Sequence, residues 1–389
     1  MGYQEKKSYL QAILLRYVNA DRSKKSAILN EFCAVCGYNR KYAIQLLKKK
    51  PVKEKKRAGL KPVYDKPALL EPLKQIWFTA DQPCGKRLKP IIKLWLPSYE
   101  STYGSLAPEI RHRLLSISPA TIDRLLKPIR ATNKLKGRCA TKPGSLLKSH
   151  IQIQFSHWDI TRPGYVEADT VAHCGDSVAG RFAWSLTVTD IFTGWTENRA
   201  MWNKEGGLVY ERISDIEKVL PFEVLGFDCD NGGEFINHAL HDYFTKREKP
   251  VQFTRSRPYK KNDNAHVEQK NWTHVRNLFG YDRLDKKKTV VLMNDLYRNE
   301  WSLLQNHFMP SMKLKSKERI GAKYKKQYEP AKTPYERVLE SDSVADTTKE
   351  KLQAIHATLN PFTLKKIIET KLVEIFKHIK VSSNVRQRL

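Results

Sequence analysis

The chain has 389 residues, of which 40% are hydrophobic and 29% are charged, and its formal net charge is +29. This length accommodates two or three domains with cores of their own, and no apolar run approaches the length of a membrane span. The first residues, Met-Gly-Tyr-Gln-Glu-Lys-Lys, lack the apolar core of a secretory signal, so we expect a soluble, cytoplasmic protein.

The positive charge is concentrated at the two ends of the chain. Residues 1–155 contain 32 Lys and Arg against 10 Asp and Glu, a net charge of +22, and residues 311–389 contain 18 against 9, a net of +9. Residues 156–310 contain 20 against 22, a net of −2. Because phosphate neutralisation supplies most non-specific affinity for nucleic acid, this distribution predicts a catalytic core flanked by DNA-binding regions.

The N-terminal region has the pattern of a helix-turn-helix unit. Helical periodicity over 27–35 is followed by a turn and by a second helix over 40–47. The second helix of such a unit enters the major groove, so Arg40 and Lys41 are candidate DNA contacts. Any small helical bundle gives a similar pattern, and base-specific readout stays open.

The six cysteines show no disulfide framework. Cys33-Ala-Val-Cys36 has the spacing of half a zinc site, but no second Cys pair or closely spaced His pair follows it. We therefore expect both to be small core residues of a helix.

A second helical region precedes a basic linker. The stretch 108–115 has the pattern of a helix, and Ser118-Pro119 supplies an N-cap and a first helical position for the next one. The basic residues on the outward face of that helix are candidate DNA contacts. They are Arg124, Lys127 and Arg130.

From about residue 155 the pattern changes to alternating strands and helices. The predicted strands span 165–173, 181–190, 194–202, 223–229 and 251–254, and the predicted helices span 208–220, 237–249 and a long segment from about Asp263. Three antiparallel strands followed by helix, strand, helix and strand is the order of the α/β ribonuclease H-like fold, with a mixed five-stranded sheet. In that fold the fourth strand runs parallel beside the first.

Three acidic residues occupy positions that this fold brings together. Asp169 lies within a predicted strand, Asp230 ends another, and Glu268 lies in the first turns of the last helix. An unpaired carboxylate is costly in a buried strand, whereas carboxylates from separate elements can hold a pair of divalent cations about 3.5–4 Å apart. The three residues are therefore candidate metal ligands and catalytic residues.

Other residues surround this site. Asp228 shares a strand face with Asp230 and is expected to have a supporting role, Asp263 is expected to cap the helix, and Trp272 is expected to pack. The basic side chains are candidate phosphate contacts, with ordinary surface charge as the alternative. They are Lys260, Lys261, Lys270 and Arg276.

The C-terminal part is basic and ends in an amphipathic helix. Residues 313–335 are expected to form either a small strand-rich piece or an extended DNA-contacting segment, and Asn360-Pro361 begins the helix. Its apolar stripe comprises Leu364, Ile367, Ile368, Leu372, Ile375, Phe376 and Ile379. The stripe must be buried on the protein itself or on another subunit, and the pattern does not distinguish these.

Several motifs resemble the integrase core of bacterial insertion-sequence transposases, which is similar to the retroviral integrase core. The most specific are Asp230-Asn231-Gly232-Gly233-Glu234-Phe235 and the segment from Tyr259 to Asn271, which contains Asn262-Asp263-Asn264-Ala265-His266-Val267-Glu268. The segments 169–175, 189–195 and 306–314 are also similar. The likeness covers roughly 155–340.

The resemblance implies a catalytic triad of Asp169, Asp230 and Glu268, and 37 residues separate the last two, close to the family's spacing. It implies Mg²⁺-dependent hydrolysis at transposon ends and joining of the freed 3′-hydroxyl to target DNA, with two ions per site and Mn²⁺ as a substitute. The implied partners are double-stranded DNA and further copies of this chain, in a bacterial, nucleoid-associated setting.

The chain is accordingly predicted to contain four parts: a helix-turn-helix module (1–60), a second helical module with a basic linker (61–150), the catalytic core (155–310) and a basic C-terminal region (311–389). A nuclease of the same fold that does not join strands is one alternative. A non-catalytic DNA-binding protein derived from a transposase is another. Strand-transfer products would exclude the first, and metal-dependent cleavage that vanishes in Asp230→Asn would exclude the second.

Overall fold

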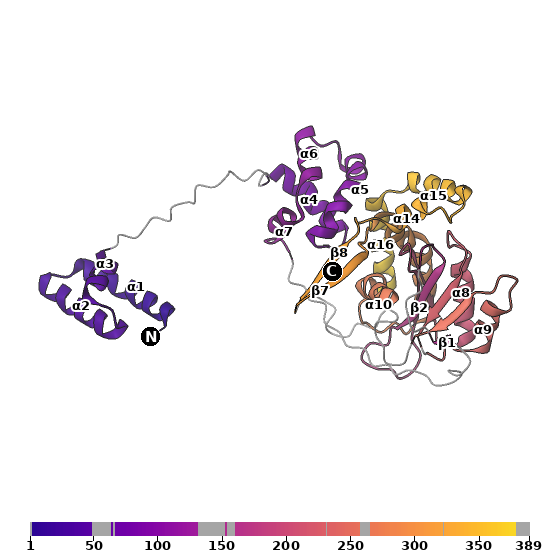
Figure 1. Ribbon diagram of the computed structural model, residues 1–389, viewed down its shortest axis with the longest axis horizontal. Helices are drawn as coiled ribbons and strands as arrows, with labels where there is room; N and C mark the ends of the chain where they lie inside the picture. The colour runs from indigo at the N-terminus through magenta and orange to yellow at the C-terminus, as the bar shows by residue number, and fades with distance from the viewer. Residues whose placement is uncertain are drawn as a thin grey trace. The chain divides into compact units, whose positions relative to one another are not determined.

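The computed structural model describes residues 2–48, 64, 67–130, 152–153, 160–230, 232–256, 265–321 and 323–378 (Figure 1). The chain divides into two compact units, residues 1–63 and 64–389. None of the helices in these ranges combines the length and the apolar composition that crossing a membrane requires.

The first unit is a three-helix bundle, α1 (Tyr3–Asn19), α2 (Arg22–Cys36) and α3 (Arg40–Lys48). The Asp21 side chain caps α2 by accepting from the Lys24 amide at 2.8 Å, and Gly37, with a φ of 64°, ends the helix in the left-handed region. Phe32 is fully buried at the centre of the bundle. The predicted helix pair is confirmed, and α1 is an addition.

The two cysteines of α2 are free thiols. Cys36 is 1% exposed and packs in the bundle core, and Cys33 packs beside it. The prediction of core residues is therefore confirmed.

The second unit begins with four helices, α4 (Pro67–Thr79), α5 (Gly85–Tyr103), α6 (Pro108–Ser116) and α7 (Pro119–Leu126). The helices predicted over 108–115 and after Ser118 are α6 and α7, and the Ser118 hydroxyl accepts from the Thr121 amide at 3.2 Å. The remaining two helices, α4 and α5, were not predicted from the sequence.

These helices share a core with the C-terminal helices α12 (Lys287–Leu296), η2 (Tyr297–Trp301), α13 (Ser302–Phe308) and α16 (Pro361–Phe376). The Trp95 indole donates to the Phe308 carbonyl at 3.0 Å, and the Phe362 ring lies edge-on to Trp95 at 5.5 Å. Ile368 and Ile375 are fully buried in the same cluster. Most of the apolar stripe of α16 is thus buried on the chain itself, with Leu372 and Phe376 half-buried against the cluster; Ile367 is exposed, and Ile379 lies outside the described residues.

The part of the second unit predicted to be the catalytic core is built on a six-stranded sheet in the order β1-β6-β5-β2-β3-β4. Its strands are β1 (Gln152–Ile153), β2 (Tyr165–Ala172), β3 (Trp184–Asp190), β4 (Thr196–Met201), β5 (Gly226–Cys229) and β6 (Gln252–Arg255). The pairs β2–β3 and β3–β4 are antiparallel, and β2–β5 and β5–β6 are parallel. This is the predicted ribonuclease H-like order. The prediction of five strands was short by one, because the two-residue β1 adds to β6.

Helices cover both faces of this sheet. On one face, α8 (Gly206–Glu217) and α9 (His238–Thr245) pack over Val166 and Ala168. On the other face runs a continuous helical segment of α10 (Ala265–Lys270), η1 (Asn271–Arg276) and α11 (Asn277–Phe279), where Val275 joins the cluster of Val171. Since side chains alternate along a strand, Glu167 and Asp169 point to the α10 side with Val171.

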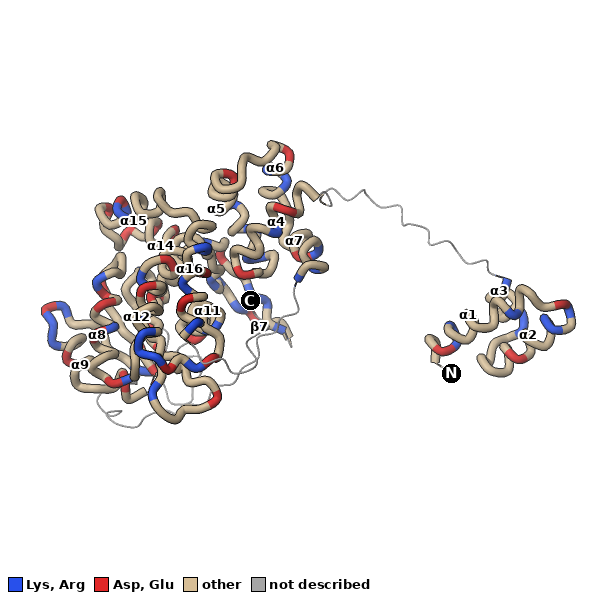
Figure 2. Tube along the Cα trace, turned by 180° about the vertical axis from the view of Figure 1, so that it is seen from behind, with Lys and Arg blue, Asp and Glu red and all other residues tan. Residues whose placement is uncertain are grey.

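The C-terminal part contains a hairpin of β7 (Leu314–Ile320) and β8 (Lys323–Tyr328), followed by α14 (Pro334–Glu340) and α15 (Asp346–Thr358). Every residue of both hairpin strands is exposed, and much of the hairpin is Lys or Arg (Figure 2). The expected strand-rich basic segment is thus a two-stranded hairpin. The division of the chain into four domains stays a prediction.

Candidate active site

The parallel pairing of β2 and β5 brings two predicted site residues together. Ala168 lies opposite Cys229 in the register, so Asp169 and Asp230 are the next residues on neighbouring strands. Burial and then repulsion from Asp230 raise the pKa of Asp169 to about 8, with smaller contributions from Glu268 and Glu234. A carboxyl whose pKa is raised in this way lies among other negative charges.

The oxygens of these carboxylates accept hydrogen bonds from nearby N–H groups. Asp169 accepts from the Thr170 amide at 2.7 Å and from the Asn271 side-chain amide at 2.6 Å. Asp230 accepts from the Gly232 amide at 2.8 Å. Asn271 is the first residue of η1 and lies three residues after Glu268, so the helix reaches Asp169 directly.

Glu167 is a further buried carboxylate that the sequence interpretation missed. It is 2% exposed and accepts from the Val267 amide at 2.9 Å, which fastens the first turn of α10 to β2. Burial raises the pKa of Glu167 to about 8, and repulsion from Asp228 and Glu268 contributes to the increase. The signal was its position two residues before Asp169, which places both acids on one strand face.

Glu234 is the second acid that was missed, although it belongs to the motif that begins at Asp230. It is 6% exposed, accepts from the Thr170 hydroxyl at 3.1 Å and pairs with Lys204 at 3.2 Å. A Cβ added at Gly232 would lie 2.5 Å from a Glu234 carboxylate oxygen and 2.8 Å from one of Asp230. The glycine therefore leaves room for both carboxylates.

The acids of this site suit a hard divalent cation in chemistry, because they offer oxygen donors and an excess of negative charge. Among the described residues, however, no group of three or more His, Cys, Asp and Glu side chains is close enough to hold a metal ion. Local N–H groups engage Asp169 and Asp230 instead. The residues thus fit the ion by donor type and charge, and their assignment as ligands stays a prediction.

Two alternative acids can now be placed. Asp228 is 4% exposed and accepts from the Thr254 hydroxyl at 2.7 Å, which ties β5 to β6 and agrees with a supporting role. Asp263 lies outside the described residues, as do Lys260 and Lys261. Trp272 is 46% exposed, so the prediction that it packs was wrong.

The remaining predicted DNA contacts near the site are directed at backbone oxygens. The Lys270 ammonium donates to the Gly194 carbonyl at 3.2 Å, and burial, followed by repulsion from Arg337 and Arg87, lowers its pKa to about 7. Arg276 donates to the Ala172 carbonyl at 3.1 Å and lies over the Tyr281 ring. The Arg276 guanidinium thereby fastens η1 to the end of β2.

The predicted contacts in the helical regions are exposed. Arg40, at the start of α3, bonds to Asn30 and Ser26 of α2, and Arg130 pairs with Asp123 at 2.8 Å. Lys41, Arg124 and Lys127 are also on the surface. Their role in DNA binding stays a prediction.

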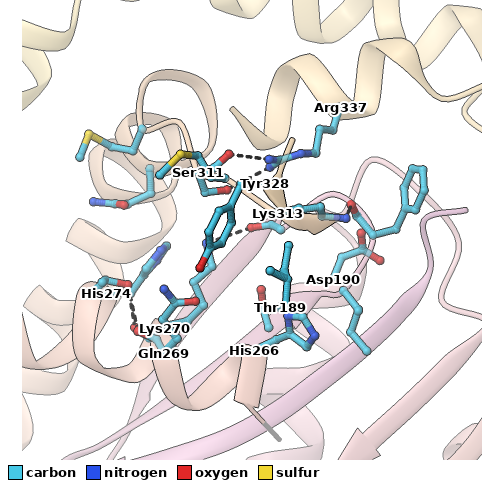
Figure 3. A pocket seen from close by; sticks show the side chains of 18 of the residues that line it. Thr189, Asp190, His266, Gln269, Lys270, His274, Ser311, Lys313, Tyr328 and Arg337 are labelled. Atoms are coloured by element: carbon cyan, nitrogen blue, oxygen red, sulfur yellow. Dashed lines mark hydrogen bonds between the residues drawn. The ribbon is translucent and has the colours of Figure 1, made fainter. Parts of the chain in front are cut away.

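A cavity of about 740 Å³ lies beside α10. It is lined from α10 and η1 by His266, Gln269, Lys270, Thr273 and His274, and from the turn between β3 and β4 by Asp190, Ile191, Phe192 and Gly194. Lys86, Arg87, Lys313, Tyr328 and Arg337 line it from other parts of the second unit (Figure 3). The cations from α5 and α14 were not foreseen, whereas Lys313 begins the basic segment that was expected to be strand-rich or to contact DNA.

No protein-family model matches the chain. The uncharacterized protein y4rM of Sinorhizobium fredii (strain NBRC 101917 / NGR234) is 39% identical over 331 residues, which cover 84% of this chain and 93% of that protein.

Among solved structures, the HTLV-2 integrase catalytic core domain in complex with magnesium is 14% identical, covering 39% of this chain and 92% of that one at a TM-score of 0.29. The catalytic core domain of BIV integrase is 16% identical, covering 46% and 95% at a TM-score of 0.28. At TM-scores this low, neither likeness supports a conclusion about this chain.

Proposed function

The chain belongs to the same family as the uncharacterized protein y4rM of Sinorhizobium fredii, and we propose that it is a DDE-type transposase, a metal-dependent polynucleotidyl transferase. The observation that supports this proposal is the parallel pairing of β2 with β5, which places Asp169 beside Asp230; burial and then repulsion from Asp230 raise the pKa of Asp169 to about 8. Asp169 lies on β2 and Asp230 directly follows β5, two neighbouring strands of a sheet with the predicted order, and Glu268 lies on α10. Glu268 is exposed on α10, and repulsion between Asp169 and Asp230 is what a divalent cation would offset.

In this proposal Asp169, Asp230 and Glu268 hold two Mg²⁺ or Mn²⁺ ions, which supply activation of the attacking oxygen and stabilisation of the leaving one. The protein's part is positioning. Asn271 orients the Asp169 carboxylate, and the Gly232 amide orients that of Asp230.

The proposed substrate is double-stranded DNA, both the ends of a mobile element and a target. The excess positive charge of the N-terminal and C-terminal parts supports this, because it supplies phosphate contacts on either side of a nearly neutral core. Joining two ends to one target requires two active sites, so we propose that several copies of the chain assemble on DNA.

The proposal is tested with purified full-length protein, Mg²⁺, labelled DNA carrying the element's own ends and a plasmid target. Wild-type protein is expected to nick the ends and join them to the plasmid, and Glu268→Gln and Asp169→Asn are expected to do neither. Glu211→Gln is the matched control, because Glu211 is an exposed acid on α8, on the opposite face of the sheet.

The alternatives give different products. Cleavage without joining would assign a nuclease of this fold. DNA binding without cleavage by any of the proteins would assign a non-catalytic DNA-binding protein and overturn the proposal.

A further inference from the structure

The cavity beside α10 has a strongly positive lining. Five Lys and Arg side chains reach it from four separate parts of the second unit, namely Lys86 and Arg87 on α5, Lys270 on α10, Lys313 before β7 and Arg337 on α14. Figure 3 shows Arg337, Lys313 and Lys270 arranged around the Tyr328 side chain.

Arg337 carries a buried charge whose hydrogen bonds go to neutral groups. It is 6% exposed, and its guanidinium donates to the Thr193 carbonyl at 3.1 Å and to the hydroxyl and carbonyl of Ser311 at 3.0 and 2.6 Å. In the part of the chain that the structure describes, no carboxylate forms an ion pair with it. Burial lowers the pKa of this guanidinium, and the charges of Glu329, Glu336 and Glu340 offset this only in part, so the charge is held at a cost.

Lys313 is a second cation of this cavity whose hydrogen bond goes to a neutral group. Its ammonium bonds to the Phe192 carbonyl and lies 4.9 Å above the Phe192 ring. Burial and then repulsion from Arg337 lower its pKa. The two cations are therefore close enough to oppose each other, and an anion between them would stabilise both.

The acid that lines the cavity does not neutralise this charge fully. Asp190 is 1% exposed, and its carboxylate accepts from the Gly164 amide at 2.8 Å and from the amide and hydroxyl of Thr193 at 2.6 Å each. These hydrogen bonds hold the Asp190 carboxylate in the turn that joins β3 to β4. Neutral donors are also present, since the cavity contains the hydroxyls of Thr273 and Tyr328 and the amide of Gln269.

We propose that this cavity holds a backbone phosphate of a DNA strand, with Arg337 and Lys313 at its floor and Lys86 and Arg87 at its rim. The site takes a phosphodiester of an extended strand. The anion site stands on the lining itself, and only the strand's route to the carboxylates rests on the proposed function.

Two observations favour a strand over a free phosphate. The cavity and the carboxylates share α10, because Lys270 lines the cavity whereas Glu268 repels Asp169. The positive charge also continues outside the cavity along both strands of the hairpin. The exposed basic residues of these strands are Lys315, Lys317, Arg319, Lys323, Lys325 and Lys326. A free phosphate would contact only the cavity, whereas successive phosphates of a strand could also contact the basic residues of the hairpin.

The test measures DNA binding without chemistry. The full-length Asp169→Asn protein, free of divalent metal, is titrated with a short labelled duplex by fluorescence anisotropy at several salt concentrations. Adding Lys86→Gln or Lys313→Gln is expected to weaken binding several-fold and to reduce the salt slope by about one, as for one lost phosphate contact. Lys93→Gln is the matched control, because Lys93 is an exposed lysine of α5 that does not line the cavity.

The outcomes separate cleanly. A reduced slope for Lys86→Gln and Lys313→Gln, but not for Lys93→Gln, supports the proposal. Equal effects of all three would show general surface charge and overturn it. Inorganic phosphate or a nucleoside triphosphate that raises the Tm of wild type but not of Lys313→Gln, with unchanged DNA slopes, would assign a free-phosphate site and also overturn it. Because these proteins are inactive by design, a failure of catalysis in the wild type leaves this result standing.

Discussion

The raised pKa of Asp169 has a measurable consequence for stability. Its pKa is 3.8 in an ordinary setting and about 8 in the folded protein, so the folded state binds this proton more tightly. The free energy of unfolding therefore falls as the pH rises from about 4 to about 8. In this range the unfolded state releases the Asp169 proton, whereas the folded state retains it. A divalent cation at the site would offset this loss.

We expect Asp169→Asn to be more stable than wild type at pH 8 in EDTA, with a Tm higher by roughly 2–4 °C, and the difference to disappear near pH 4. Thermal unfolding at the two pH values measures this. Glu211→Gln, an exposed acid, is expected to show no such difference. A wild type that outlasts Asp169→Asn at pH 8 without metal would contradict the raised pKa.

Gly232 is expected to be required for activity more than for stability. The Cβ of Gly232→Ala would displace the ends of the Asp230 and Glu234 side chains, and small displacements of catalytic groups reduce rates by up to roughly a hundredfold. Because both displaced groups are flexible side-chain ends, the Tm should change little. Gly233→Ala is the control, since its Cβ meets no atom within 4 Å. Equal nicking rates for the two variants would contradict this role.

Part of the acidic site could be predicted from the sequence, and the cavity could not. Asp169 and Asp230 each belong to a short motif and a predicted strand, so the predicted pairing of those strands brings the two together, whereas their role with Glu268 stays a prediction. The cavity's cations are separated by long stretches of chain, from Arg87 to Arg337, and nothing local marks them. Their proximity results from the way α5 and α14 pack within the second unit.

At the scale of elements, internal prolines explain why α4 and α5 were not predicted. Pro72 lies inside α4, and Pro90 and Pro97 lie inside α5, where proline removes a backbone hydrogen bond and normally ends a helix. Both helices persist because tertiary packing outweighs propensity. Trp77 of α4 and Trp95 of α5 are fully buried. By contrast, α7 and α16 have a capping residue followed by proline, and both were predicted.

The contact between α5 and α7 depends on a glycine. The Gly85 amide donates to Asp123 at 2.9 Å, and a Cβ at Gly85 would lie 2.2 Å from the Pro119 carbonyl oxygen. Since that atom belongs to the backbone, Gly85→Ala must separate the two helices, and we expect a loss of about 1–3 kcal/mol.

Thermal or urea unfolding measures this loss, and Gly207→Ala is the matched control. Gly207 lies in the first turn of α8, and its Cβ would meet no atom within 4 Å. It is therefore expected to hold or raise stability by up to ~1 kcal/mol. A Gly85→Ala protein as stable as wild type would show that α5 and α7 do not rely on this close approach.

At the scale of the whole molecule, the two units have separate cores, and the second has its first and last helices in one cluster. Phe362 of α16 is 6% exposed and packs at 5.5 Å from Trp95, 6.0 Å from Tyr99 and 5.4 Å from Tyr103, all on α5. The core of the second unit therefore closes only when residues nearly the full length of that unit apart have met, which makes it one cooperative structure.

We expect calorimetry of the full-length protein to show two unfolding transitions, one for each unit, and Phe362→Ala to lower only that of residues 64–389. The loss is expected to be about 3–5 kcal/mol, as for other buried aromatic residues replaced by alanine. Phe32→Ala is the reciprocal change, because Phe32 is fully buried in the first unit and should lower only the other transition. If either substitution shifted both transitions together, the two units would be coupled, and the expectation of two independent transitions would be wrong.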